Sequence, residues 1–196
     1  MQDIAQELGI SRPALYYYFK NKEEILVSLT EGLTIAAQQL ATQVVEKGKP
    51  PREALRELIY QHATLILHRP VQFRVVDQAE GSLPEEQRKI AESARRNLLL
   101  RFTEVVQRGI DTGCFRQVNA KVSAFSIIGM CNWTAWWFKA GGARSAEEIA
   151  EMIADFSLHA LEREDQRKNR QAGVDETLRI LEENVSQLKG LIETQR

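Results

Sequence analysis

The 196-residue sequence has few of the residues that build disulfide, metal or membrane proteins. It contains two cysteines, Cys114 and Cys131, and three histidines, without the spacing of a metal site. We therefore expect ordinary buried thiols in a reducing cytoplasm and no bound metal. No apolar run reaches the roughly 18 residues of a transmembrane helix, and no signal peptide is apparent. These absences predict a soluble protein with no membrane partner.

An excess of charge of one sign is also missing. Lysine and arginine number 26 against 27 acidic residues, so the formal net charge is −1. No general basic field draws this chain to nucleic acid, and any DNA binding must come from a local patch and from dimerisation. We find no nucleophile–base pair, paired-carboxylate motif or glycine-rich phosphate loop. The sequence therefore predicts a protein that is not an enzyme and needs no cofactor.

The sequence does contain a strong helical pattern. Apolar residues recur at three- and four-residue spacing almost throughout, strand alternation is absent, and 43% of residues are hydrophobic. This pattern predicts an all-α fold. The longer expected helices cover residues 21–46, 52–69, 71–80, 84–111, 119–140 and about 145–161. Between them lie Pro50–Pro51, Pro70, Gly81, a turn at 113–116 and Gly141–Gly142.

The first 24 residues predict two short helices joined by a tight turn. Ile4, Ala5 and Leu8 lie on one face of the first helix, and Gly9 suits a left-handed turn position. Ile10 is apolar and is expected to fill the corner between the two helices. This order of elements is the layout of a helix-turn-helix DNA reader.

The second helix is predicted to span Arg12 to Phe19. Ser11 is its expected N-cap, and Pro13 fits its first turn. At about 100° per residue, Leu15 and Phe19 point inward. The outward and flanking positions then belong to Ala14, Tyr16, Tyr17 and Tyr18. A helix that reads a DNA groove fits this arrangement, because a small residue allows close approach and phenols can donate to phosphates. A small helical hairpin with surface tyrosines is the alternative.

The start of the third helix predicts a phosphate contact. Asn21 is its expected cap, with Glu24 completing a capping box. Lys22 then lies at a helix N-terminus, where free N–H groups and the helix dipole favour an anion.

The run from Ile4 to Glu24, with DIAQELGIS, PALYYYF and KNKEE, resembles the TetR family of bacterial transcription regulators. The resemblance implies a repressor that binds double-stranded operator DNA as a homodimer and is released by a small-molecule effector. Its implied base contacts are Gln2, Arg12, Pro13 and Ala14, with Tyr17 on the same outward face. Its implied phosphate contacts are Tyr16, Tyr18 and Lys22, and Ser11 caps the helix and touches the DNA backbone.

The family has a further helix before this motif, whereas Met1 lies where the second family helix begins. We expect that an internal methionine has been taken as the start, or that the N-terminus was removed. The alternative function is a helical ligand-binding or interaction dimer that no longer binds DNA.

Two adjacent segments near the end of the helical body predict a dimer interface. The run from Val122 to Phe138 is apolar almost all round, and Ser145 caps a helix that is apolar on one side. Two such helices from each subunit suggest a four-helix interface, as the family resemblance also implies. The alternative is that both helices belong to a monomer core.

The family resemblance also implies a ligand pocket within residues 55–140. The candidate lining residues are large or polar side chains of the expected body helices: His62, Ile66, Phe73, Leu98, Phe102, Phe125, Met130, Trp133 and Trp137. Plain core packing is the alternative for each of them.

The run GMCNWTAWWFKAGGARSAEEIA, residues 129–150, resembles the TetR regulators that sense acyl-CoA thioesters. That resemblance implies that Trp133 and Trp136 stack on an adenine and that Lys139 and Arg144 meet phosphates. An unspecified hydrophobic effector is the alternative.

These patterns divide the chain into three parts. Residues 1–24 form a partial helix-turn-helix domain that extends into the helix to about residue 46, and residues 47–162 form a ligand-binding and dimerisation domain. Residues 163–196 are a charged linker and a C-terminal amphipathic, coiled-coil-like helix. Its heptad positions are Val174, Leu178, Leu181, Val185, Leu188 and Ile192.

Overall fold

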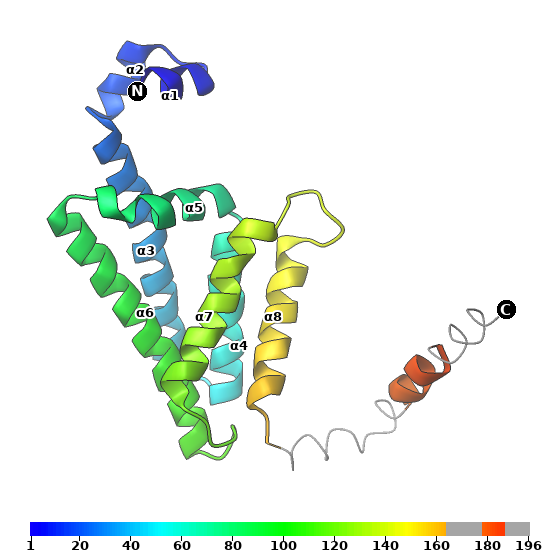
Figure 1. Ribbon diagram of the computed structural model, residues 1–196. Coiled ribbons are helices and arrows are strands. Elements are labelled where there is room, and N and C mark those ends of the chain that lie inside the picture. The colour runs from blue at the N-terminus through cyan, green and yellow to red at the C-terminus, as the bar shows by residue number, and fades with distance from the viewer. Residues whose placement is uncertain (164–177, 187–196) are drawn as a thin grey trace.

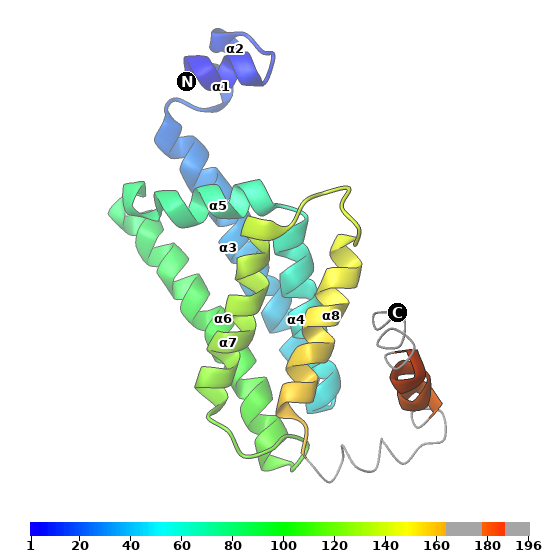
Figure 2. The same ribbon diagram turned by 45° about the vertical axis from the view of Figure 1, so that its right-hand side comes forward.

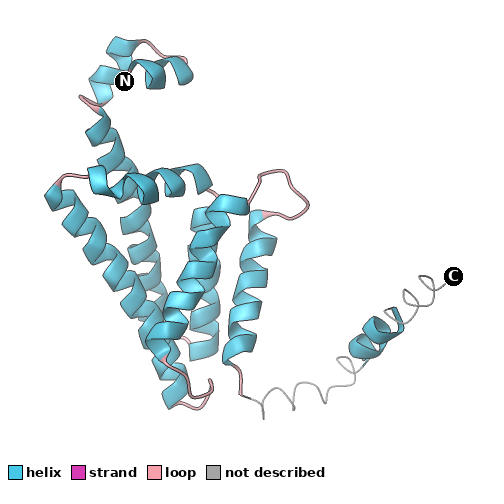
Figure 3. Ribbon diagram, in the orientation of Figure 1, coloured by secondary structure: helices cyan, strands magenta, loops and turns pink. Residues whose placement is uncertain are grey.

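The computed structural model describes residues 1–163 and 178–186, and these are helical with no β-strand among them (Figures 1 and 3). The fold is therefore all-α, as the periodicity predicts. The helices are α1 (Gln2–Glu7), α2 (Arg12–Tyr18), α3 (Lys22–Glu46), α4 (Pro51–Leu67), α5 (Pro70–Ala79), α6 (Glu85–Asp111), α7 (Ala120–Trp137) and α8 (Ala146–Leu161). A short 3-10 helix, η1 (Glu80–Ser82), joins α5 to α6.

The two short N-terminal helices lie beyond the body at one end of the molecule. In both views α1 and α2 sit past α5, and the long helix α3 runs from them into the body (Figures 1 and 2). The helix-turn-helix is therefore joined to the rest of the protein through α3.

The body is a bundle with α4 at its centre, because α4 packs against α3, α6, α7 and α8. The side chains that fill this core are fully buried and almost entirely apolar. The largest are Phe102, Phe115, Leu55, Leu58, Ile59, Ile66, Leu67 and Leu158.

Four helix starts are capped by the side chains of Ser11, Asn21, Asn119 and Ser145. The capping box at Ser145 is complete. The box expected at Asn21 is wrong in one bond, because the Glu24 carboxylate accepts from the backbone N–H of Lys20 at 2.7 Å instead of that of Asn21.

Several local expectations differ from the structure. The second helix ends at Tyr18, since Phe19 is extended. Gly81 does separate α5 from α6, as expected, but the residues around it form a 3-10 helix. Ile10 does not fill the corner between α1 and α2, because it is 40% exposed.

The expected C-terminal heptad helix lies only partly within the described residues. Residues 178–186 are helical, and Leu178, Leu181 and Val185 are exposed. Val174, Leu188, Ile192 and nearly all of the expected linker lie outside the described residues.

Candidate DNA-binding surface and ligand cavity

Helix α2 presents its polar and aromatic side chains outward. Leu15 is 3% exposed and faces inward, whereas Tyr17 is 85% and Tyr18 72% exposed. Arg12 lies 5.4 Å from the ring centroid of Tyr16, on the flank of the helix. Pro13 is also exposed and Ala14 is partly exposed, so the outward arc has the composition that the pattern predicts.

The helix starts bring further polar groups to this end of the molecule. The Ser11 hydroxyl accepts from the backbone N–H of Ala14 at 3.3 Å, which fixes the start of α2. The Asn21 side chain likewise accepts from the backbone N–H of Glu24 at 2.8 Å. Lys22 is exposed in the first turn of α3, and Gln2 is exposed in the first turn of α1. Hydroxyl, guanidinium, phenol and ammonium donors are thus available for an anionic backbone.

A cavity of about 140 Å³ lies inside the body, between α3, α4, α5, α6 and α7. Four of the predicted pocket residues meet there: His62, Ile66, Phe73 and Leu98. The other lining residues, from α3 and from parts of α4, α5, η1, α6 and α7, were not predicted from the sequence. The missed residues are Leu33, Thr34, Ala37, Leu65, Val76, Asp77, Glu80, Arg95 and Asn132.

The other predicted pocket residues do not line this cavity. Phe102 is fully buried next to His62, and the two rings pack in a T-shaped arrangement with their centroids 5.9 Å apart. Phe125 is 57% exposed on the surface of α7, so its expected place in the body pocket is wrong. Trp133 is 63% exposed and stacks on Trp136, with 5.4 Å between the ring centroids. Its expected place in the body pocket is therefore also wrong.

His62 is the most perturbed ionisable group of the cavity wall. Its side chain is buried, and its Nε2 lies 3.1 Å from Oδ1 of Asn132. Burial lowers the pKa of His62 to about 4, against the smaller opposing effect of the hydrogen bond to Asn132. The imidazole is therefore neutral near pH 7.

This depressed pKa predicts a stability effect of acid. An unfolded histidine takes up a proton below about pH 6.5, whereas the folded one does so only near pH 4. Protonation therefore favours the unfolded chain as the pH falls through this window. In denaturant titrations between pH 7 and pH 4, we expect His62→Phe to lose less stability than the wild type. Equal losses in the two chains would contradict the assignment, and His159→Phe, at an exposed histidine, is the control.

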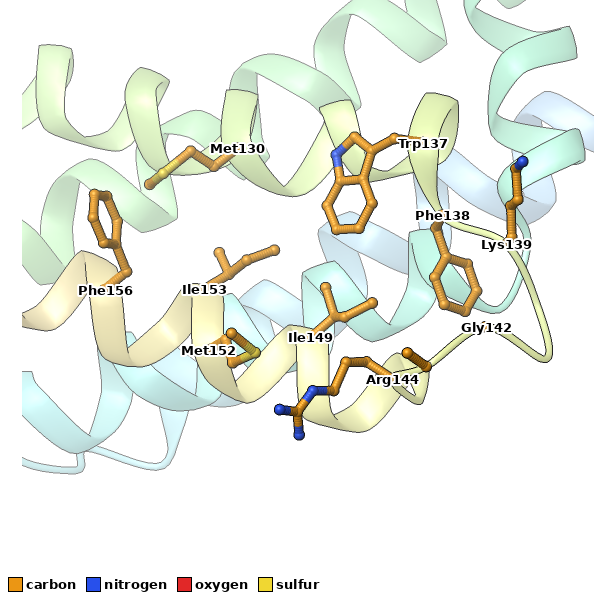
Figure 4. A pocket seen from close by; sticks show the side chains of 11 residues that line it. Met130, Trp137, Phe138, Lys139, Gly142, Arg144, Ile149, Met152, Ile153 and Phe156 are labelled. Carbon is orange, nitrogen blue, oxygen red and sulfur yellow. The ribbon is translucent and has the colours of Figure 1, made fainter. Parts of the chain in front are cut away.

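A second, larger hollow of about 560 Å³ is a surface groove between α7 and α8. Figure 4 shows Met130 and Trp137 on α7 across from Ile153 and Phe156 on α8. The predicted residues Met130, Trp137, Lys139 and Arg144 thus line this groove and not the internal cavity. Arg144 is paired with Glu148 at 3.2 Å.

The apolar surface beside this groove is extensive. Side chains of α7 and α8 that the sequence assigns to a buried interface are exposed in this single chain: Val122, Phe125, Trp133, Trp137, Met152 and Phe156. Many exposed large apolar side chains on two neighbouring helices are typical of an interaction surface.

Family profiles match both parts of the chain. Residues 48–161 match the profile described as the C-terminal domain of tetracyclin repressor-like proteins, and residues 1–29 match that of bacterial regulatory proteins of the tetR family. The chain belongs to the TetR family. The predicted family and the predicted role as a transcription regulator are thereby confirmed.

Individual relatives agree with the family assignment. The TetR family regulator PfmR of Thermus thermophilus is 32% identical, with a TM-score of 0.73 over 83% of this chain and 88% of that chain. The transcriptional repressor KstR2 of Mycolicibacterium smegmatis is 25% identical over 77% of this chain and 75% of its own. The fold is also that of AibR, solved with isovaleryl coenzyme A and operator DNA, with a TM-score of 0.66 at 23% identity over 82% of this chain and 85% of that chain.

The described residues contain neither a membrane-spanning helix nor a metal cluster. No helix among them has the length and apolar character needed to cross a bilayer. Within the same residues, no group of three or more histidine, cysteine or acidic side chains could hold a metal ion.

Proposed function

We propose that this TetR regulator is a cytoplasmic, homodimeric, non-catalytic repressor that a small ligand releases from its operator. The observation that carries the proposal is the outward arc of α2, where Tyr17 and Tyr18 are exposed while Leu15 anchors the helix. Residues 1–24, continuing into α3, serve as the DNA-binding part, and residues 47–162 bind the ligand and dimerise.

The proposed dimer forms through α7 and α8. The exposed apolar side chains of these two helices would be covered by the same helices of a second subunit, in an isologous four-helix interface. A dimer places two copies of α2 on one DNA duplex, at the spacing of about 34–36 Å between successive major grooves.

Helix α5 offers a route from ligand to DNA. Three consecutive residues of α5 contact α3, the cavity and α7 in turn. The Gln72 side chain donates to the backbone carbonyl of Leu29 on α3 at 2.9 Å, Phe73 lines the cavity, and Arg74 donates to the carbonyl of Ala135 on α7. A ligand that moves Phe73 therefore moves a helix bonded to α3, which carries the DNA-binding end. Such a shift would change the separation of the two α2 helices.

An acyl-CoA thioester is a second candidate effector. AibR, which has the same fold as this chain, has been solved with isovaleryl coenzyme A. The groove beside Lys139 and Arg144 offers cations for phosphates, and Trp133 and Trp136 offer aromatic faces, so a thioester there would bind within the dimer interface proposed above. The internal cavity itself is too small for a nucleotide, since ligand pockets for larger molecules usually measure about 300–1,000 Å³.

The proposal is tested by selecting DNA from a randomised duplex library with the full chain. Fluorescence anisotropy then measures affinity for the selected and a scrambled site at several salt concentrations. Sequence-specific binding supports the repressor, whereas a dimer that enriches no sequence favours the ligand-binding alternative.

Loss of one phosphate contact has a defined signature. We expect Lys22→Ala to weaken binding to every sequence and to lower the slope of log affinity against log salt by about one unit per bound subunit. Lys89→Ala, at an exposed lysine paired with Glu85 on α6, is the matched control and leaves the slope unchanged. An unaltered slope for Lys22→Ala means that Lys22 does not contact a phosphate.

A further inference from the structure

The internal cavity carries one polar feature that its apolar walls do not explain. His62 on α4 and Asn132 on α7 both line it and bond to one another. Within the described part of the chain, Nδ1 of His62 is buried without a hydrogen-bond partner, and the side chain of Asn132 makes no bond beyond the one to His62. Buried polar groups normally find partners, so the unpaired Nδ1 of His62 points to an occupant.

The pair offers one donor and one acceptor whichever way the Asn132 amide is turned. If Nε2 of His62 donates to Oδ1, then Nδ1 remains as an acceptor and the Asn132 amide nitrogen as a donor. If the amide is flipped and donates to Nε2, then Nδ1–H becomes the donor and Oδ1 the acceptor. Because Nδ1 and Nε2 point to opposite sides of the ring, one ligand group meets Nδ1 and not the Asn132 amide as well. A hydroxyl fits Nδ1 in either arrangement, since it can donate to a free Nδ1 or accept from Nδ1–H.

The size and charge of the cavity restrict the rest of the ligand. Its volume of about 140 Å³ is close to the roughly 150 Å³ of an engineered apolar cavity that binds benzene. Arg95, the one lysine or arginine that lines it among the described residues, is paired with Glu80, and Asp77 adds a second carboxylate. An anionic ligand would therefore meet two carboxylates and a guanidinium that is already paired. An ammonium ligand can only donate, so it would match Nδ1 in the first of the two arrangements and not in the second.

We propose that this cavity binds a compact, uncharged apolar molecule whose hydroxyl bonds to the His62–Asn132 pair. The inference rests on the proposed function, because it names the chemical class of the effector. The walls from Leu33, Ile66, Phe73 and Leu98 hold the hydrocarbon part, and the pair selects the polar group.

The test uses four probes of similar size: benzyl alcohol, toluene, benzoate and benzylamine. Calorimetry on the full chain gives the ratio of the toluene dissociation constant to that of benzyl alcohol. In His62→Phe, which keeps a planar ring, we expect this ratio to fall about tenfold, because the alcohol loses its hydrogen bond and toluene does not. Asn132→Leu is a second variant with the same expected direction. His68→Phe, at an exposed histidine outside the cavity, keeps the wild-type ratio.

Other outcomes overturn the proposal. An unchanged ratio in both His62→Phe and Asn132→Leu means that the pair does not select a hydroxyl. Tighter binding of benzoate or benzylamine than of benzyl alcohol means that the cavity takes a charged ligand. Binding that survives the cavity-filling variant Leu98→Phe without loss places the probe elsewhere.

DNA release is measured separately by anisotropy, so the two proposals fail in different ways. Benzyl alcohol that binds through His62 but leaves the DNA complex intact supports the cavity assignment and contradicts release through it. An operator complex that forms normally while the cavity takes none of the four probes overturns the cavity assignment alone.

Discussion

Replacing Ala14 with glutamate is expected to reduce operator affinity by at least about a hundredfold. Ala14 lies on the outward arc of α2, where a small side chain permits close approach to the DNA. A carboxylate there faces the negative potential of the duplex, and like-charge contacts cost several kcal/mol. A cost of about 2.7 kcal/mol already corresponds to a hundredfold loss of affinity. A dimer carries the change twice.

The same substitution is expected to leave the helix intact. Ser11 is the N-cap of α2, and its hydroxyl accepts from the backbone N–H of residue 14. A glutamate three residues after a serine cap completes a capping box, which satisfies the N–H of the cap residue itself. Ala14→Glu therefore separates loss of DNA binding from loss of folding.

Fluorescence anisotropy on the selected operator, together with thermal unfolding, measures both effects. Ser93→Glu adds the same charge at an exposed position of α6, within the body, and controls for net charge. If Ala14→Glu unfolds as the wild type does and still binds the operator within a fewfold, α2 does not face the DNA.

The DNA-binding end is predictable from sequence because its signals are local. The N-caps Ser11 and Asn21, the left-handed Gly9 and the inward Leu15 each depend on residues within one or two turns. Ile10 shows the limit of such reasoning, because its burial depends on what packs over the corner.

The cavity is only half predictable because it forms where distant helices meet. His62 and Ile66 are one turn apart on α4, so periodicity places them on one face. The contribution of α3, which supplies Leu33, Thr34 and Ala37, depends on how that helix crosses α4 and α6. Likewise, the aromatic residues of α7 give no signal in the sequence that separates a pocket wall from an outer surface.

Replacing Gly109 with alanine is expected to destabilise the protein by about 3 kcal/mol. Gly109 lies inside α6, where alanine is normally favoured over glycine by up to about 1 kcal/mol. Here a Cβ atom would lie 2.1 Å from the ring of Phe115, which is 1% exposed in the core. The ring cannot retreat easily, because the backbone N–H of Phe115 also donates to the carbonyl of Gly109 at 2.9 Å. Steric overlap therefore outweighs helix propensity.

Denaturant titration and thermal unfolding measure this effect, and a loss of about 3 kcal/mol corresponds to roughly 6–12 °C in a chain of this size. Gly32→Ala is the matched control within α3. The new Cβ atom would lie 3.7 Å from Nε2 of Gln72 on α5, which is an ordinary van der Waals contact. That variant is expected to be neutral or stabilised.

A double-mutant cycle identifies Phe115 as the cause. In a Phe115→Leu background the smaller side chain leaves room for the new Cβ, so adding Gly109→Ala should cost no more than about 1 kcal/mol. Full additivity of the two changes would mean that the penalty arises in the α6 backbone and not at the ring. In that case the end of α6 alone would set the position of the following turn. Phe115 would lie close to Gly109 as a result of that position, and its packing would not hold the turn in place.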